Sequence, residues 1–102
     1  MVEDSELKKV GLELMFLTPE KCSREEGISA VELAKLLDLS LDIVKKKLKI
    51  LHEKEIIRVY GINPKLWKFD EYQFQKMDEN DEVYRLLCNF DDVDFDRYFS
   101  YN

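Results

Sequence analysis

Residues 28–70 decide the fold of this chain, and they read ISAVELAKLLDLSLDIVKKKLKILHEKEIIRVYGINPKLWKFD. Two short amphipathic segments are separated by a tight polar break. Two runs rich in β-branched and aromatic residues follow, joined by Gly61-Ile62-Asn63-Pro64. The order predicts helix, turn, helix and hairpin. We expect helices over residues 30–37 and 41–54, and antiparallel strands over residues 56–60 and 65–69.

Both predicted helices carry start signals. Ser29 precedes the first apolar run and Glu32 follows three residues later, which is the spacing of a capping box. Ser40 can cap the second helix, and Asp42 lies in its first turn, where a carboxylate suits the positive end of the helix dipole. The small Ala34 lets the second helix cross the first at close range.

The second helix has two chemically opposite faces at 100° per residue. Val44, Leu48 and Leu51 fall on one face, flanked by Ile43 and Ile50. Asp42, Lys45, Lys46, Lys49 and Glu53 fall on the other face. An apolar stripe that anchors the helix, opposite three lysines, is what a helix inserted into a DNA groove requires.

The hairpin also divides into two faces, because strand residues alternate sides. Ile57, Val59, Trp67 and Phe69 fall on one face, and Arg58, Tyr60, Leu66 and Lys68 fall on the other. A tryptophan on the inner face is more often a core anchor than a platform for a ligand, so we expect Trp67 to pack. Ile28 is placed to add a short strand beside the hairpin.

The run from Leu33 to Ile57 resembles the winged helix-turn-helix transcriptional regulators, broadly the MarR, ArsR and Lrp-like kinds. The residues that carry the resemblance are Leu33-Ala34, Leu39-Ser40, Ile43-Val44, Leu48, Leu51 and Ile56-Ile57. Two positions depart from the pattern. Asp38 stands where such turns usually carry glycine, and Glu55 stands where a glycine often closes the second helix, which leaves that helix end less sharply defined. Aspartate tolerates the left-handed conformation better than most residues.

The resemblance implies an α+β winged helix-turn-helix fold that binds double-stranded DNA. Residues 41–54 would be the recognition helix and the hairpin over residues 56–69 the wing. Lys45, Lys46 and Lys49 would enter the major groove, with Leu41 and Asp42 at the leading end. Arg58, Lys65 and Lys68 would touch phosphate, and Tyr60 is a further contact on the outer face.

The net charge of −6 argues against a simple nucleic-acid binder, but the charge is unevenly distributed. Residues 33–69 carry a net charge of +5, whereas residues 1–32 carry −4 and residues 70–102 carry −7. Positive charge is therefore confined to the segment that this fold would present to DNA. We expect one contiguous positive surface, with the acidic flanks on the far side.

The length predicts a single domain over residues 1–102, with its core in residues 28–70. An N-terminal helix is expected over residues 5–17, where Leu7, Val10, Leu14 and Leu17 recur at helical spacing. An acidic helical extension is expected over residues 71–102, with helices over residues 82–90 and 91–99. Surplus apolar residues in both flanking regions suggest a homodimer, although packing within one domain would also cover them.

The sequence offers no recognisable catalytic set, so we expect a DNA-binding protein rather than an enzyme. The three glycines are too dispersed for a phosphate loop, and the single His52 has no serine or cysteine partner in a known pattern. We expect no metal and no cofactor. Cys22 and Cys88 are expected to be free thiols, with Cys88 buried. No apolar run is long enough for a membrane span and no signal peptide is visible, which predicts a cytoplasmic protein.

A second function class stays open. In it, the winged helix is a scaffold for protein–protein interaction, and the acidic, aromatic C-terminal segment docks a basic partner. Salt-dependent retention on a DNA column would separate the two alternatives.

Overall fold

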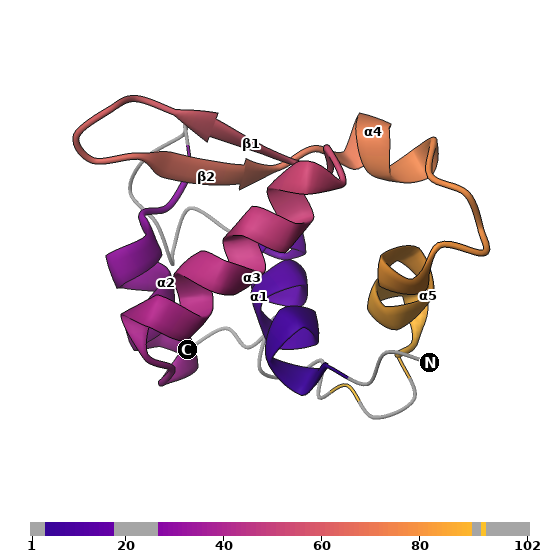
Figure 1. Ribbon diagram of the computed structural model, residues 1–102, viewed down its shortest axis with the longest axis horizontal. Helices are drawn as coiled ribbons and strands as arrows, with labels where there is room; N and C mark the ends of the chain where they lie inside the picture. Colours follow the sequence, from indigo (N-terminus) through magenta and orange to yellow (C-terminus); the bar gives the residue numbers. More distant parts are fainter. Residues whose placement is uncertain (1–3, 18–26, 91–92, 94–102) are drawn as a thin grey trace.

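The chain is an α+β protein in which helices surround one side of a two-stranded antiparallel hairpin (Figure 1). The computed structural model describes residues 4–17, 27–90 and 93. In chain order, the elements are α1 (Ser5–Met15), α2 (Ala30–Leu37), α3 (Leu41–Glu53), β1 (Ile57–Tyr60), β2 (Leu66–Phe69), α4 (Glu71–Gln75) and α5 (Glu82–Cys88). None of these helices has the length and apolar character that a bilayer span requires.

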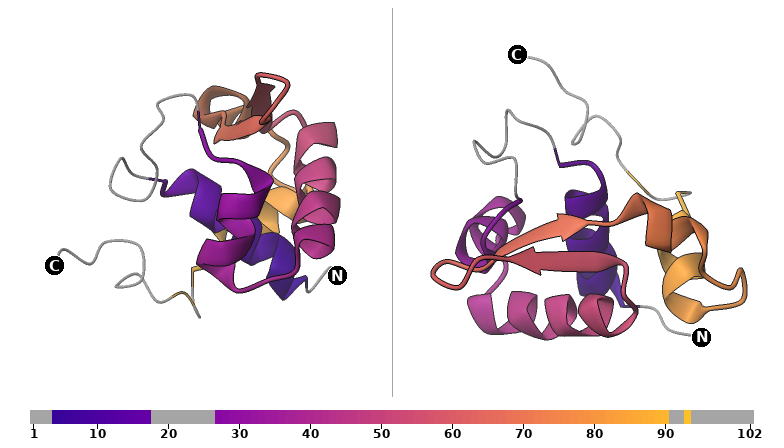
Figure 2. Two further views of the ribbon diagram at one scale, coloured as in Figure 1. Left: turned by 90° about the vertical axis from the view of Figure 1, so that its left-hand side faces the viewer. Right: turned by 90° about the horizontal axis from the view of Figure 1, so that it is seen from above.

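Helix α1 is central, with α2, α3 and α5 packed around it (Figures 1 and 2). Leu7, Val10 and Leu14 are buried, as their spacing predicts, but Leu12 and Glu13 are buried as well. A helix covered on several sides buries more than one stripe. Gly11 faces α5 so closely that an added Cβ would lie 2.5 Å from Cδ2 of Leu87.

The α2–α3 pair forms as predicted, with a sharp turn over three residues. The Ser29 Oγ accepts the N–H of Glu32 at 3.2 Å, and its hydroxyl donates to the Glu32 carboxylate at 3.0 Å. Ser40 caps α3 by accepting the N–H of Ile43 at 3.3 Å. Asp38 ends α2 with a φ of 54°, in the left-handed region. The N–H of Leu39 then reaches back to the carbonyl of Ala34 at 3.0 Å, which closes the helix.

Helix α3 ends more sharply than its sequence suggests. It stops at Glu53, one residue before the predicted end, and Glu55 adopts a φ of 65°. Glu55 therefore occupies the left-handed conformation that a glycine would adopt more easily. The expectation of a poorly defined helix end was wrong, because the buried Ile56 and Ile57 on the next segment fix the direction of the chain.

The hairpin has the predicted faces, and each strand starts one residue later than expected. Ile57 pairs with Phe69 and Val59 with Trp67, and these residues share the face toward the helices. Trp67 is partly buried against the core, so its packing role is confirmed. Ile28 forms the predicted extra bridge: its N–H donates to the Trp67 carbonyl at 2.9 Å and its carbonyl accepts the Trp67 N–H at 2.7 Å.

The flanking regions differ from expectation in four places. Helix α1 ends at Met15 rather than residue 17, and α5 ends at Cys88 rather than residue 90. Residues 71–77, where no separate helix was predicted, contain α4, which is capped by Asp70. Cys88 is exposed, because α5 buries only Val83 and Leu87; the prediction of a buried thiol was wrong. Cys22 and almost all of the predicted helix over residues 91–99 lie outside the described residues.

The surplus apolar residues of the N-terminal helix have partners in the same chain. Met15, Phe16 and Leu17 are partly buried and pack against the core. That core is one cluster, built from buried side chains of α1, α2, α3, α5, Ile28 and the start of the hairpin. Packing within the domain therefore covers these three side chains, and no second chain is needed to explain them.

Candidate nucleic-acid interface

Helix α3 presents the basic face that its sequence predicts. Val44, Leu48 and Leu51 are 0%, 1% and 0% exposed. Asp42, Lys45, Lys46 and Lys49 are exposed on the other side, and Leu41 is half-buried at the leading end. Opposite environments on the two sides of one helix fix its rotation about its axis. The three ammonium groups are therefore held in solvent by the burial of the apolar stripe.

Two other lysines near this face are engaged with acids of distant helices. The Nζ of Lys47 lies 2.6 Å from a carboxylate oxygen of Asp4, the N-cap residue of α1. The Nζ of Lys54 lies 2.8 Å from a carboxylate oxygen of Asp81, the N-cap residue of α5. In the run Lys45-Lys46-Lys47, the third lysine is thus a structural residue. Sequence position alone could not separate it from its neighbours.

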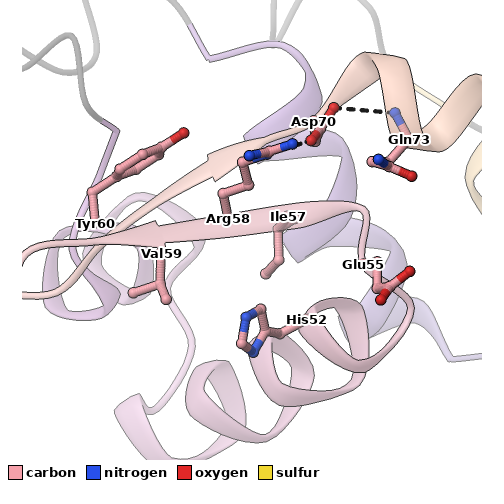
Figure 3. Close-up of a pocket in the computed structure, with 8 residues that line it drawn as sticks. All are labelled: His52, Glu55, Ile57, Arg58, Val59, Tyr60, Asp70 and Gln73. Atoms are coloured by element: carbon pink, nitrogen blue, oxygen red, sulfur yellow. Dashed lines mark hydrogen bonds and ion pairs between the residues drawn. The ribbon is translucent and has the colours of Figure 1, made fainter.

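The outer face of the hairpin carries the second group of predicted contacts. Arg58 and Lys68 are cross-strand partners, Tyr60 lies opposite Leu66, and Lys65 precedes β2; all except Leu66 are exposed. The Nε of Arg58 donates to Asp70 at 2.5 Å, so this guanidinium is partly neutralised. Figure 3 shows Arg58 turned toward Asp70 at the base of the hairpin.

The predicted residues form two surfaces rather than one. His52 of α3 packs edge-on against Trp67, with ring centroids 5.6 Å apart, so α3 lies on the inner side of the hairpin. Arg58 and Lys68 project from the opposite side. The expectation that the acidic flanks lie on the far side is also wrong at Asp70 and Asp81, which contact Arg58 and Lys54. Long-range packing decides these neighbours, and no local pattern encodes it.

Three helix-capping aspartates share one arrangement. Asp4, Asp70 and Asp81 each accept backbone N–H at the start of a helix and also a basic side chain from α3, from its C-cap residue Lys54 or from β1. Partial burial raises the pKa of Asp4 and Asp81, but the hydrogen bonds from Lys47 and Lys54 and from the capped N–H groups outweigh it. The pKa of Asp70 is lowered chiefly by Arg58. All three carboxyls therefore have a pKa below the ordinary aspartate value.

These shifts predict a loss of stability in acid. A carboxyl with a lowered folded-state pKa stabilises the fold above its unfolded pKa, about 3.9, and this stabilisation is lost as the pH falls through the folded pKa. We expect the free energy of unfolding from urea melts to be nearly level between about pH 7 and 5 and to fall below about pH 4. The double variant Asp4→Asn/Asp81→Asn should be less stable at neutral pH and lose part of this acid dependence. Asp42→Asn, on an exposed acid of α3, is the matched control; an unaltered pH profile in the double variant would contradict the assignment.

Gly27 is a structurally important position that no sequence pattern identified. Gly27 has a φ of 128°, and a Cβ there would lie 2.2 Å from the carbonyl oxygen of Trp67. The missing side chain allows Ile28 to pair with β2. In the sequence, the only sign of this role is an isolated glycine two residues ahead of the capping serine, Ser29.

Among the described residues, no three His, Cys, Asp or Glu side chains gather as metal ligands.

Comparisons with known proteins add no relative. No family model matches the chain, and no curated protein or solved structure matches it.

Proposed function

We propose that this protein is a non-catalytic DNA-binding regulator with a winged helix-turn-helix fold. In this proposal α2 and α3 are the helix-turn-helix, α3 is the recognition helix, and the β1–β2 hairpin is the wing. One observation carries it: α3 is locked by a fully buried apolar stripe, while Lys45, Lys46 and Lys49 are exposed on its other side. A rigid helix with a cationic outer face suits the major groove of a duplex.

The hairpin contributes differently from the helix in this proposal. Lys65 and Lys68 are exposed cations on or beside β2, and Lys65 lies next to the hairpin tip. Arg58 is already held by Asp70, so part of its charge is neutralised before any phosphate is bound. We therefore assign most of the electrostatic contact to α3, with the hairpin as a second and separate contact to the backbone.

Salt dependence tests the proposal. If each monomer neutralises about four phosphates, the logarithm of the binding constant should fall with the logarithm of salt concentration at a slope near −3.6. The double variant Lys46→Ala/Lys49→Ala should flatten that slope by roughly two units and keep the fold, because both side chains point to solvent. Binding of a random duplex, followed by fluorescence anisotropy at several salt concentrations, gives the slope.

Lys47→Gln is the matched control, since it removes a lysine from the same helix whose ammonium group faces Asp4. It should leave the slope within about half a unit of wild type while lowering stability. An unaltered slope in the double variant would place the DNA site elsewhere. No binding by the wild-type chain at about 50 mM salt, where phosphate contacts are strong, would favour the protein-interaction alternative.

A homodimer is a further prediction. A two-fold dimer would suit a palindromic operator, and the N-terminal helix and C-terminal helices are its proposed contacts. We expect sedimentation at micromolar concentration to give about twice the chain mass of 12.2 kDa. The packing of Met15 and Phe16 into the core weakens the case for α1. A 12.2 kDa species at high concentration would contradict the dimer.

A further inference from the structure

The exposed face of α3 carries one row of charged side chains in the order acid, base, base, acid. Lys46, Lys49 and Glu53 follow Asp42 by four, seven and eleven residues, which places all four within about 60° of one another at 100° per residue. All four are exposed, on the side of the helix opposite the buried Leu48. We call these four residues the charge row. The row is about 16 Å long at 1.5 Å per residue.

The charges of this row are not neutralised within the chain. Asp42 and Lys46 are four residues apart, a spacing at which opposite charges on a helix often pair. Lys49 and Glu53 have the same spacing. Among the described residues, neither of these couples forms an ion pair, and the ion pairs of α3 and its C-cap residue come from lysines outside the row. The four charged groups therefore face solvent and are available to a ligand.

A second copy of α3 does not match the charge row. In an antiparallel two-fold contact, Asp42 of one copy would face Glu53 of the other, which brings two acids together. Lys46 would face Lys49 in the same way, and a parallel contact would place each residue against itself. The row instead matches a surface with hydrogen-bond acceptors at its middle and a donor toward one end.

The two ends of the charge row differ in their neighbours. The start of α3 carries Asp42 and, after it, the exposed Lys45 and Lys46. At the end of α3, Glu53 and Glu55 are exposed, and Lys54 between them is already held by the aspartate that caps α5. Phosphate is therefore attracted to the start of α3 and repelled at its end. In recognition helices it is the N-terminal residues that reach the base edges, which agrees with this polarity.

The base edges in the major groove match the first part of the row. Guanine shows two acceptors, O6 and N7, to which a lysine donates. Cytosine shows one donor, its N4 amino group, with no acceptor beside it on the same base, so a carboxylate binds it without repulsion. Adenine also shows an amino group, but its N7 acceptor lies next to that group and would repel a carboxylate. Asp42 therefore favours cytosine over the other three bases.

We propose that Asp42 selects cytosine in the DNA site, while Lys46 and Lys49 bind guanine. This assignment rests on the proposed DNA binding and names the bases that it prefers. Asp42 and Lys49 are about 10 Å apart along the helix, so the three contacts fall on about three neighbouring base pairs. Glu53 lies beyond them and contacts no base. An acid within a basic face lowers the affinity for most sequences and spares those that offer it a donor, which turns a general attraction to phosphate into a sequence preference.

Selection from a pool of duplexes with a randomised centre of about one helical turn tests the proposal, using the full-length chain and sequencing of the bound fraction. The wild-type chain should enrich cytosine by about tenfold at one position, within about three base pairs of enriched guanines. Asp42→Asn should change the enriched base at that position from cytosine to adenine, because an asparagine amide binds N6 and N7 of adenine together. The guanine positions should stay as they are. If Asp42 only stabilised the start of α3, the variant would weaken binding to all sequences alike.

Glu53→Gln is the matched control, since it removes an acid from the other end of the same row. It should raise the affinity for every sequence by a similar factor and leave the enriched bases unchanged. An unchanged cytosine preference in Asp42→Asn would overturn the proposal, as would enrichment of a base other than cytosine by the wild type at the position that this variant changes. A wild-type chain that binds the pool with the expected salt slope but enriches no base would overturn it and leave DNA binding in place. No binding of the pool at about 50 mM salt would remove both.

Discussion

Replacing Leu48 with alanine is expected to lower the free energy of unfolding by about 2–5 kcal/mol, as for other buried leucine truncations. Leu48 is 1% exposed at the middle of the buried stripe of α3, between Val44 and Leu51. Deleting three side-chain carbons there removes buried apolar surface and leaves a cavity that α1 and α2 can fill only in part. Urea melts followed by far-UV circular dichroism measure the change.

Leu36→Ala provides the matched control, because Leu36 is 40% exposed on the neighbouring helix α2. The same chemical change there should cost about 1 kcal/mol or less. A loss below about 0.5 kcal/mol for Leu48→Ala would mean that α3 is rotated differently about its axis. The three lysines would then face elsewhere, so this experiment also tests the orientation on which the proposed function rests.

Replacing Gly27 with alanine is expected to cost about 3 kcal/mol or more, from two separate causes. Its φ of 128° lies in a region that residues with a Cβ rarely adopt. The new Cβ would also lie 2.2 Å from the carbonyl oxygen and 2.7 Å from the carbonyl carbon of Trp67, both backbone atoms of β2. Relief requires separating Ile28 from β2, which breaks two backbone hydrogen bonds.

Gly61→Ala is the control for backbone strain without a buried clash. Gly61 also has a positive φ, 78°, but a Cβ there would meet only the Pro64 carbonyl oxygen, at 2.9 Å, near the exposed hairpin tip. Its cost should be nearer 1–2 kcal/mol. Amide exchange of Ile28 and Trp67 should rise in Gly27→Ala and stay near wild type in Gly61→Ala. Equal stability losses would show that the contact with Trp67 contributes little.

The local structure of this chain follows from its sequence, because helix caps and apolar spacing act between residues only a few positions apart. Ser29 and Ser40 satisfy N–H groups three residues ahead, and the spacing of Val44, Leu48 and Leu51 selects one helix face. The change from helical to alternating periodicity near Ile56 marks the start of the hairpin, and alternation then sets which side chains face the core. These features were predictable to within one or two residues.

Tertiary structure alone decided which charged side chains are available at the surface and which are held by a partner. Lys47 is no different from Lys45 and Lys46 in local sequence, and only the approach of Asp4, far away in the chain, makes it structural. The same holds for Arg58 with Asp70 and for the burial of α1 on several sides. The need for glycine at position 27 depends on where Ile28 meets β2. Side-chain periodicity determines the local conformation and the side of each helix or strand that packs on the core. The contacts between distant residues depend on how separate elements pack together, and no short sequence pattern encodes that packing.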